Sequence, residues 1–222
     1  MLQRPQASKL FAAALVAPMA VLPAAPAIAA GAGAESLVDQ EATELAQLRF
    51  PRLRMPSVPR MPRVFAITPE RRALLNTIRY AEGTWKDGED KGYRIMYGGG
   101  QFQDLSRHPE RVIVKRYTSA AAGAYQFLPK TWKGVAKELK LSSFEPRHQD
   151  QAALHLVERR GALKEIDRKG LTRNAMAKLA PEWASFPTWT GRSAYGQPVK
   201  SPQDLASFYS SNLRQLRNQL GA

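Results

Sequence analysis

The sequence predicts an α+β domain that is mostly helical and carries one small β-hairpin lobe. Several segments show the start and stop signals of helices, and two short β-favouring runs are separated by glycines. With 222 residues, 44% of them apolar, the chain can form one domain of ordinary size plus extensions. A helical domain with a small β lobe leaves a cleft between its lobes, where an extended ligand commonly binds.

The first helix is predicted to begin at Pro69 and to end before Gly83. Thr68 can cap its N-terminus, proline fits the first helical position, and glycine is common where a helix ends in a left-handed residue. Leu75 and Ile78 recur at helical spacing, so they share one face of this helix.

Glu82 continues the same apolar face at the last turn of the helix. Partial burial and the negative end of the helix dipole both raise the pKa of a carboxyl group placed there. An acid that keeps its proton near neutral pH can protonate a leaving group, so Glu82 is a candidate general acid. The alternative interpretation is a surface glutamate at a fraying helix end.

The β lobe and the remaining helices follow along the chain. The β lobe is expected at residues 92–105 and 111–117. The later helices are expected at residues 129–139, 146–160, 172–180 and 202–220. Together with the first helix, these elements place the globular domain at residues 64–222.

The formal net charge of +14 predicts affinity for a polyanion, such as nucleic acid, anionic lipid or the bacterial cell wall. The chain contains no cysteine, which excludes disulfides and thiolate metal sites. Its three histidines form no metal-binding motif. We therefore expect neither a metal ion nor a cofactor.

Residues 1–29 have the three regions of a secretory signal peptide. Arg4 and Lys9 precede an apolar, alanine-rich stretch, and the small residues Ala27 and Ala29 fit a cleavage site after Ala29. Prolines interrupt the stretch, so an uncleaved membrane anchor is the less favoured alternative. The sequence thus predicts export to the periplasm, the cell wall or the medium. Export argues against nucleic acid as the partner.

Residues 30–63 are predicted to connect the signal peptide to the domain. Residues 35–48 suit a short acidic helix, and residues 49–63 alternate prolines with arginines and contain no acid. Dense proline and like charges favour an extended chain. We interpret this basic linker as a spacer with weak affinity for the anionic cell envelope.

Two further stretches suit carbohydrate binding. Residues 119–132 bring an aromatic ring and an amide, Tyr125 and Gln126, next to small residues, and sugars bind to such groups. The alternative is a turn with Tyr125 in the core. Residues 182–197 are rich in aromatic side chains, which either fill the core, as we expect of Trp183, or line a sugar-binding groove. Residues 149–163 look structural.

A series of short motifs resembles the lambda-phage endolysin family of lytic transglycosylases. The motifs span residues 70–200 and read YAEGT, GY…YGG, F.D.S.HP, S.AAG.YQ, an ERGAL-like stretch and WAS.P…YGQ. The resemblance implies a lysozyme-like fold and cleavage of the β-1,4 bond after N-acetylmuramic acid in peptidoglycan. It also implies that Glu82 is the catalytic acid/base. The substrate-binding residues that it implies are Tyr93, Gly98, Gly99, Asp104, His108, Ser119, Tyr125, Gln126, Tyr195 and Gln197.

The chain departs from the family pattern at several positions. Arg94 stands where an acid follows GY, Ala124 replaces an arginine, and an insertion follows the WAS.P motif. A lytic transglycosylase, as the resemblance implies, uses the muramoyl C6 hydroxyl as an internal nucleophile, so one carboxyl group suffices.

Two other functions remain open. One is a hydrolytic lysozyme that uses a second carboxylate, for which the candidates are Asp87, Glu89, Asp90 and Asp104. The other is a non-catalytic module that binds the cell wall. The expected partners are the glycan strands of peptidoglycan, and we expect a monomer.

Overall fold

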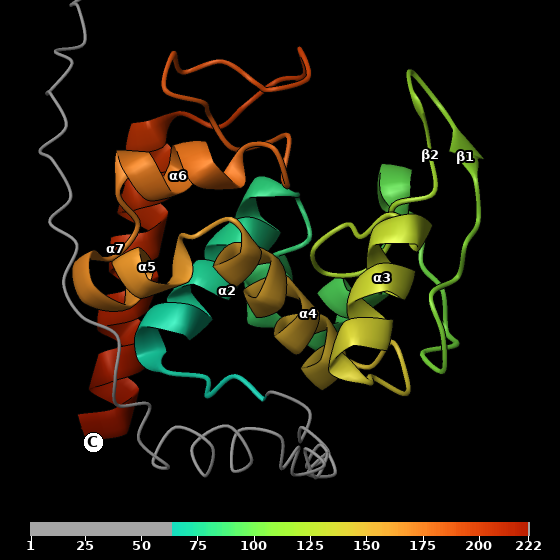
Figure 1. The fold of residues 1–222 in the computed structure, drawn as a ribbon, viewed down its shortest axis with the longest axis horizontal. Helices are drawn as coiled ribbons and strands as arrows, with labels where there is room; N and C mark the ends of the chain where they lie inside the picture. Colours follow the sequence, from blue (N-terminus) through green and yellow to red (C-terminus); the bar gives the residue numbers. More distant parts are fainter. Residues whose placement is uncertain (1–63, 222) are drawn as a thin grey trace, which may run out of the picture. The chain divides into compact units, whose positions relative to one another are not determined.

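The computed structural model describes residues 64–221, and the predicted signal peptide and basic linker lie outside this range. The helices are α2 (Pro69–Ala81), α3 (Pro129–Leu139), α4 (Pro146–Arg159), α5 (Leu163–Lys169), α6 (Arg173–Leu179) and α7 (Pro202–Gly221). In Figure 1, α2 and α4 lie between α3 with the β hairpin on one side and α5, α6 and α7 on the other. No helix within the described range is long and apolar enough to cross a lipid bilayer.

Helix α2 begins and ends as its sequence predicts. Thr68 Oγ1 accepts a hydrogen bond from the Arg71 N–H at 3.4 Å, and Pro69 occupies the first turn. Glu82 is the C-cap residue, and Gly83 follows in the left-handed region with a φ of 74°. The chain therefore turns away directly after Glu82.

The core forms around α2, which packs along α7 and also contacts α4 and α5. Leu75 and Ile78 are fully buried on the face that leads to Glu82. A buried hydrogen bond of 2.8 Å, donated by Asn76 Nδ2 to Asn212 Oδ1, joins α2 to α7. The catalytic candidate thus stands on a helix that is fixed by packing on several sides.

The β lobe is smaller than predicted. Strands β1 (Ile113–Val114) and β2 (Thr118–Ser119) pair antiparallel; β1 lies inside the predicted second run, and β2 follows directly after its end. The predicted first run, residues 92–105, instead forms 3₁₀ turns, among them η2 (Asp90–Arg94) and η3 (Tyr97–Gly99), with isolated bridges. Gly98 and Gly99 take left-handed φ values of 80° and 93°, which reverse the backbone and prevent a continuous strand.

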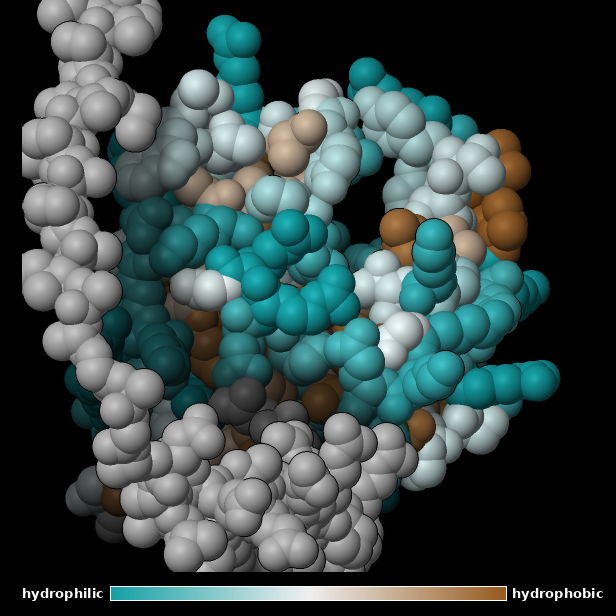
Figure 2. Space-filling model, in the orientation of Figure 1, coloured by the Kyte–Doolittle hydropathy of each residue, from teal (hydrophilic) through white to brown (hydrophobic). Residues whose placement is uncertain are grey.

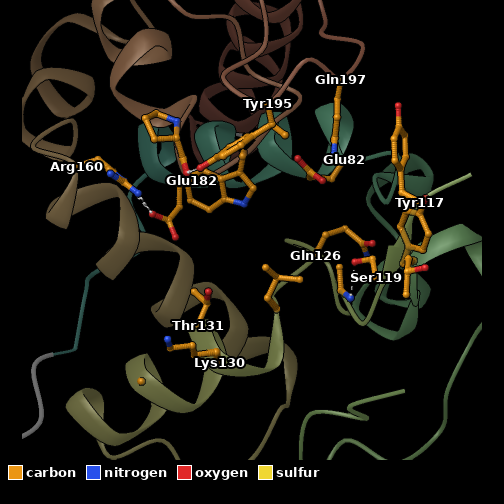
Figure 3. A pocket seen from close by; sticks show the side chains of 18 of the residues that line it. Glu82, Tyr117, Ser119, Gln126, Lys130, Thr131, Arg160, Glu182, Tyr195 and Gln197 are labelled. Atoms are coloured by element: carbon orange, nitrogen blue, oxygen red, sulfur yellow. Dashed lines mark hydrogen bonds and ion pairs between the residues drawn. The ribbon is translucent and has the colours of Figure 1, made fainter. Parts of the chain in front are cut away.

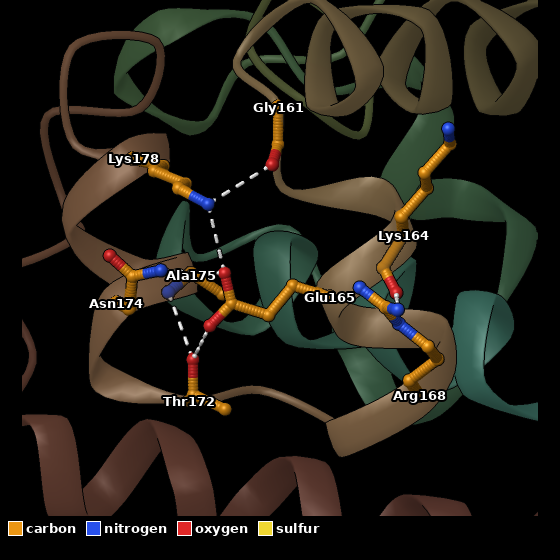
Figure 4. Close-up of polar contacts among 8 residues, drawn as sticks. All are labelled: Gly161, Lys164, Glu165, Arg168, Thr172, Asn174, Ala175 and Lys178. Atoms are coloured by element: carbon orange, nitrogen blue, oxygen red, sulfur yellow. Dashed lines mark hydrogen bonds and ion pairs between the residues drawn. The ribbon is translucent and has the colours of Figure 1, made fainter.

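The short helices α5 and α6 are joined by a polar cluster around Glu165 (Figure 4). Its carboxylate accepts hydrogen bonds from Thr172 Oγ1 at 2.5 Å, Asn174 Nδ2 at 2.6 Å and Lys178 Nζ at 2.9 Å. Thr172 also caps α6, and Lys178 reaches the Gly161 carbonyl oxygen at the end of α4. These bonds fix the chain that leads from α6 into residues 181–197. Helix α5 was not predicted from the sequence.

Candidate active site

Glu82 lies half-buried at the end of α2, on the wall of a large cavity. Its Oε1 accepts a hydrogen bond of 2.6 Å from the Ser185 hydroxyl group. Burial raises the pKa of the Glu82 carboxyl from its ordinary value of 4.5 to about 7, and the Ser185 hydrogen bond opposes this rise. A large fraction of Glu82 side chains therefore carries a proton at neutral pH.

The cavity has a volume of about 780 Å³, within the range of ligand-binding clefts. It is lined by the β hairpin, the start of α3, the end of α4 and residues 181–197, which surround Glu82. Figure 2 shows the opening between the β hairpin and the helices on this face of the molecule. The predicted cleft between the lobes is therefore present.

Several predicted site residues meet in this cavity, namely Glu82, Ser119, Gln126, Tyr195 and Gln197 (Figure 3). Gln126 is fixed because its Nε2 donates to the carbonyl oxygens of Ile95 and Gly123. Its side-chain oxygen is then free to accept a hydrogen bond from a ligand. Tyr195 is 61% exposed and its hydroxyl group donates to the Pro181 carbonyl oxygen at 2.7 Å, which holds the ring against the cavity wall.

Other predicted substrate-binding side chains lie in the core instead. The hydroxyl groups of Tyr93 and Tyr125 both donate to Asp150 Oδ1, and Tyr125 is only 1% exposed. The buried His108 pairs through Nε2 with the Phe127 carbonyl oxygen at 2.8 Å. Their aromatic rings gain more from burial than from exposure, and Asp150 and Phe127 satisfy their polar atoms. These side chains hold the site in shape and do not line the cavity.

The remaining predicted site residues shape turns. Gly98 and Gly99 form the reversal next to Tyr97, which does line the cavity, and the Gly98 carbonyl oxygen accepts from Lys115 Nζ at 2.7 Å. Asp104 Oδ1 accepts the Ser106 N–H at 2.8 Å and stands outside the cavity. Asp104 is therefore a turn residue in this structure.

The departures from the family pattern also lie outside the cavity lining. Arg94 donates a hydrogen bond to the Gln103 carbonyl oxygen. Ala124 is fully buried, and its N–H is bound by Gln149 Oε1 at 2.9 Å. Gln149 also donates to the carbonyl oxygens of Tyr93 and Phe144, so it has a structural role, as expected, whereas Arg159 and Arg160 at the end of the stretch 149–163 line the cavity.

Some residues in or next to the cavity were not singled out from the sequence. Ser185 lies 103 positions from Glu82, so only the fold reveals their contact. Glu182 is a second carboxylate of the lining, and Arg160 holds it through Nε at 2.9 Å and Nη2 at 2.8 Å. Ser185 and Glu182 both belong to the aromatic stretch 182–197, and that stretch was the signal available in the sequence. Lys130 and Tyr117 carried no sequence signal of their own.

Comparisons with known proteins identify the family of the chain. A family model described as Endolysin matches residues 72–216. The endolysin of Escherichia phage lambda is 37% identical over 137 residues, which cover 59% of this chain and 83% of the relative. The endolysin of Escherichia phage P2 is 32% identical over 151 residues, which cover 62% of this chain and 88% of the relative.

Solved structures show the same likeness. Bacteriophage lambda lysozyme complexed with a chitohexasaccharide superposes with a TM-score of 0.60 at 33% identity, over 67% of this chain and 97% of that chain. A second structure of lysozyme from bacteriophage lambda gives a TM-score of 0.55 at 30% identity, over 70% and 96% of the two chains. The predicted lysozyme-like α+β fold is confirmed.

Proposed function

Because this chain belongs to the endolysin family, we propose that it degrades peptidoglycan as a lytic transglycosylase. It cleaves the β-1,4 bond between N-acetylmuramic acid and N-acetylglucosamine and leaves a 1,6-anhydro sugar. The observation that carries the proposal is Glu82, a carboxyl group with a pKa of about 7 on the wall of a large cavity. A group with that pKa can both give and take a proton at neutral pH.

In the first step, Glu82 acts as a general acid. Ser185 donates to Oε1, so Oε2 is the oxygen left to carry the transferable proton. That proton passes to the glycosidic oxygen, the bond from C1 to this oxygen breaks, and N-acetylglucosamine leaves with a free hydroxyl group. Positive charge develops at C1 and the ring oxygen of the muramoyl sugar, facing the new Glu82 carboxylate.

In the second step, the same carboxylate acts as a general base. It accepts the proton of the muramoyl C6 hydroxyl group while this oxygen attacks C1 and closes the anhydro ring. Glu82 is protonated again, and no water is consumed. The hydroxyl group belongs to the reacting sugar, so its effective concentration is high and a second protein carboxylate is not needed.

The carboxylates around the site favour a mechanism with one catalytic carboxyl group over a mechanism with two. Among the described residues that line the cavity, Glu182 is the other acid, and its ion pair with Arg160 occupies it. Asp87, Glu89 and Asp90, considered above for a hydrolase, are exposed and absent from the lining. A hydrolytic lysozyme needs a second carboxylate placed to activate water. We therefore favour the transglycosylase.

We propose that Ser119, Gln126, Tyr195 and Gln197 bind the glycan strand. The exposed ring of Tyr195 offers a face for a pyranose, and the free oxygen of Gln126 can accept a hydrogen bond from a sugar hydroxyl or N-acetyl group. The lambda lysozyme structure complexed with a chitohexasaccharide supports this proposal by similarity.

We also propose that the protein is exported, on the basis of residues 1–29. The substrate lies outside the cytoplasm, so the location and the reaction agree. Mass spectrometry of the protein purified from the periplasm is expected to find an N-terminus at Ala30. A full-length chain in the cytoplasm would contradict export and leave the enzymatic proposal in place.

Product analysis tests the enzymatic proposal. Purified peptidoglycan is digested with the wild type and with Glu82→Gln, and soluble fragments are identified by mass spectrometry. We expect anhydromuropeptides from the wild type and none from the variant. Fragments with reducing muramic acid ends would show a hydrolase. Wall binding without any released fragment would show a non-catalytic binding module.

A further inference from the structure

One end of the cavity is positively charged and lies away from Glu82. We call it the basic end; it consists of Lys130, Thr131, Gly134, Arg159, Arg160 and Glu182. In Figure 3, Lys130 and Thr131 stand on α3 across the cavity from Glu82, and Arg160 stands on the α4 side. Because Glu182 takes up the charge of Arg160, the remaining positive charge belongs to Lys130 and Arg159.

The positive charges of Lys130 and Arg159 are available to bind a ligand. Within the described residues no carboxylate oxygen lies within 4.0 Å of Lys130 Nζ. Arg159 Nη1 lies 3.9 Å from Glu138 Oε1, while the other oxygen of Glu138 accepts from His155 at 2.7 Å. An exposed ion pair at 3.9 Å is weak, so a ligand carboxylate can compete with Glu138 for Arg159. The basic end therefore attracts anions.

Gly134 leaves open space at the same end. It lies inside α3, where glycine destabilises a helix relative to alanine. Apart from its chain neighbours and the backbone of its own helix, no heavy atom of the described residues lies within 4 Å of a Cβ built at Gly134, and its φ is not positive. Neither packing nor backbone conformation requires glycine here, and the residue lines the cavity. Its missing side chain leaves room for a ligand in the cavity that Lys130 and Arg159 also line.

We propose that the basic end is a subsite for the acidic peptide that branches from the glycan strand. This inference rests on the function proposed above. The sugars of the strand are uncharged at their hydroxyl and N-acetyl groups, whereas the stem peptide on the lactyl group of N-acetylmuramic acid carries free carboxylates. The basic end shares one cavity with Glu82, so a sugar at Glu82 and its own peptide can occupy the site together.

The subsite gives the enzyme a preference for strands that carry peptides. Lys130 and Arg159 bind the peptide carboxylates, and the gap at Gly134 accepts the peptide backbone. Charge in an open cleft contributes to both encounter rate and selectivity. A strand without peptides still reaches Glu82 but lacks these contacts.

Binding to the full-length Glu82→Gln protein tests this inference without requiring turnover. The ligands are peptidoglycan oligomers of defined length in three forms: with free peptide carboxylates, with those carboxylates amidated, and with the peptides removed by an amidase. The amidase leaves a carboxylate on each lactyl group, so these carboxylates of the third form are also converted to amides. Affinities are measured by calorimetry. We expect the first form to bind about tenfold more tightly than either of the others.

Variants on the same Glu82→Gln background locate the effect. Lys130→Ala combined with Arg159→Ala is expected to weaken binding of the peptide-bearing oligomer about tenfold more than binding of the stripped one. Gly134→Leu is expected to act similarly by filling the gap, and leucine is the better helix former, so misfolding is not a confounding cause. Lys137→Ala is the matched control because Lys137 is exposed on α3 and absent from the cavity lining.

The outcomes separate this inference from the proposed function. Equal binding of the three ligand forms, or equal weakening of all of them by the double variant, would overturn the peptide subsite. Loss of affinity on stripping but not on amidation would overturn the role of charge. Absence of anhydro products from the wild type would count against the proposed function alone, since the binding comparison does not depend on turnover.

Discussion

The pH dependence of folding should change when Glu82 is replaced by glutamine. The Glu82 carboxyl has a pKa of about 7 in the folded protein and an ordinary value of 4.5, so the folded state holds one more proton between these pH values. Stability contributed by the protonated form is therefore present below pH 4.5 and is lost as pH rises through 7. The glutamine variant has no such proton to lose.

The size of the effect follows from the shift in pKa. Each pKa unit corresponds to about 1.4 kcal/mol, so ionising Glu82 costs the folded state roughly 3 kcal/mol well above pH 7. Glutamine is neutral, similar in shape, and still offers an oxygen to the Ser185 hydroxyl group. Glu82→Gln should therefore match the wild type at pH 4 and exceed its stability by roughly 3 kcal/mol at pH 8.5.

Urea unfolding at a series of pH values measures this difference, because other titrating groups cancel between the two proteins. Glu89→Gln is the control, since Glu89 is exposed and its side chain is remote from the cavity lining. We expect the stability gain at high pH in Glu82→Gln and not in the control. A stability difference between Glu82→Gln and the wild type that does not change with pH would refute the reasoning that burial holds a proton on this carboxyl.

Further predictions concern activity and local stability. The rate of peptidoglycan cleavage should fall by about 10³-fold in Glu82→Gln, measured by release of soluble muropeptides, and the wild-type rate should decline on the alkaline side near pH 7. Ser185→Ala should move this alkaline limb to higher pH, because the hydrogen bond from Ser185 stabilises the carboxylate and its removal raises the pKa of Glu82. A limb at the same or a lower pH would contradict the contact. Glu165→Gln should destabilise the fold by about 1–2 kcal/mol at pH 7 and by little near pH 3, because hydrogen bonds from Thr172 and Lys178 lower the pKa of this carboxyl. Urea unfolding at both pH values measures the difference. An equal loss of stability at both pH values would contradict the charge-based explanation. Gly123→Ala should cost more than 2 kcal/mol by thermal unfolding, because Gly123 has a φ of 80° and its Cβ would lie 2.3 Å from Gln149 Oε1; a stable variant would contradict this packing.

Local signals in the sequence predicted the position of Glu82 correctly. Thr68, Pro69 and Gly83 fix the start and the end of α2 through contacts between near neighbours. The apolar spacing of Leu75 and Ile78 then determines which face is buried. Such information is contained within a few turns of chain, so no tertiary structure is needed to read it.

Long-range contacts decided what the sequence left open. Tyr125 suits both a sugar-binding platform and a core position, and the buried carboxylate of Asp150, 25 positions away, fixes its hydroxyl group in the core. The hydrogen bond between Ser185 and Glu82 spans 103 positions and has no local signal. Apolar residues of segment 92–105 suggest strands, but the left-handed Gly98 and Gly99 turn the chain before a strand can extend.

The most direct test of the account is an NMR titration of the Glu82 side-chain carboxyl carbon in the folded protein. We expect a midpoint near pH 7, raised by burial, with a further rise in Ser185→Ala. A midpoint near the ordinary value of 4.5 would contradict it, because Glu82 would then be ionised at neutral pH and could not protonate the glycosidic oxygen.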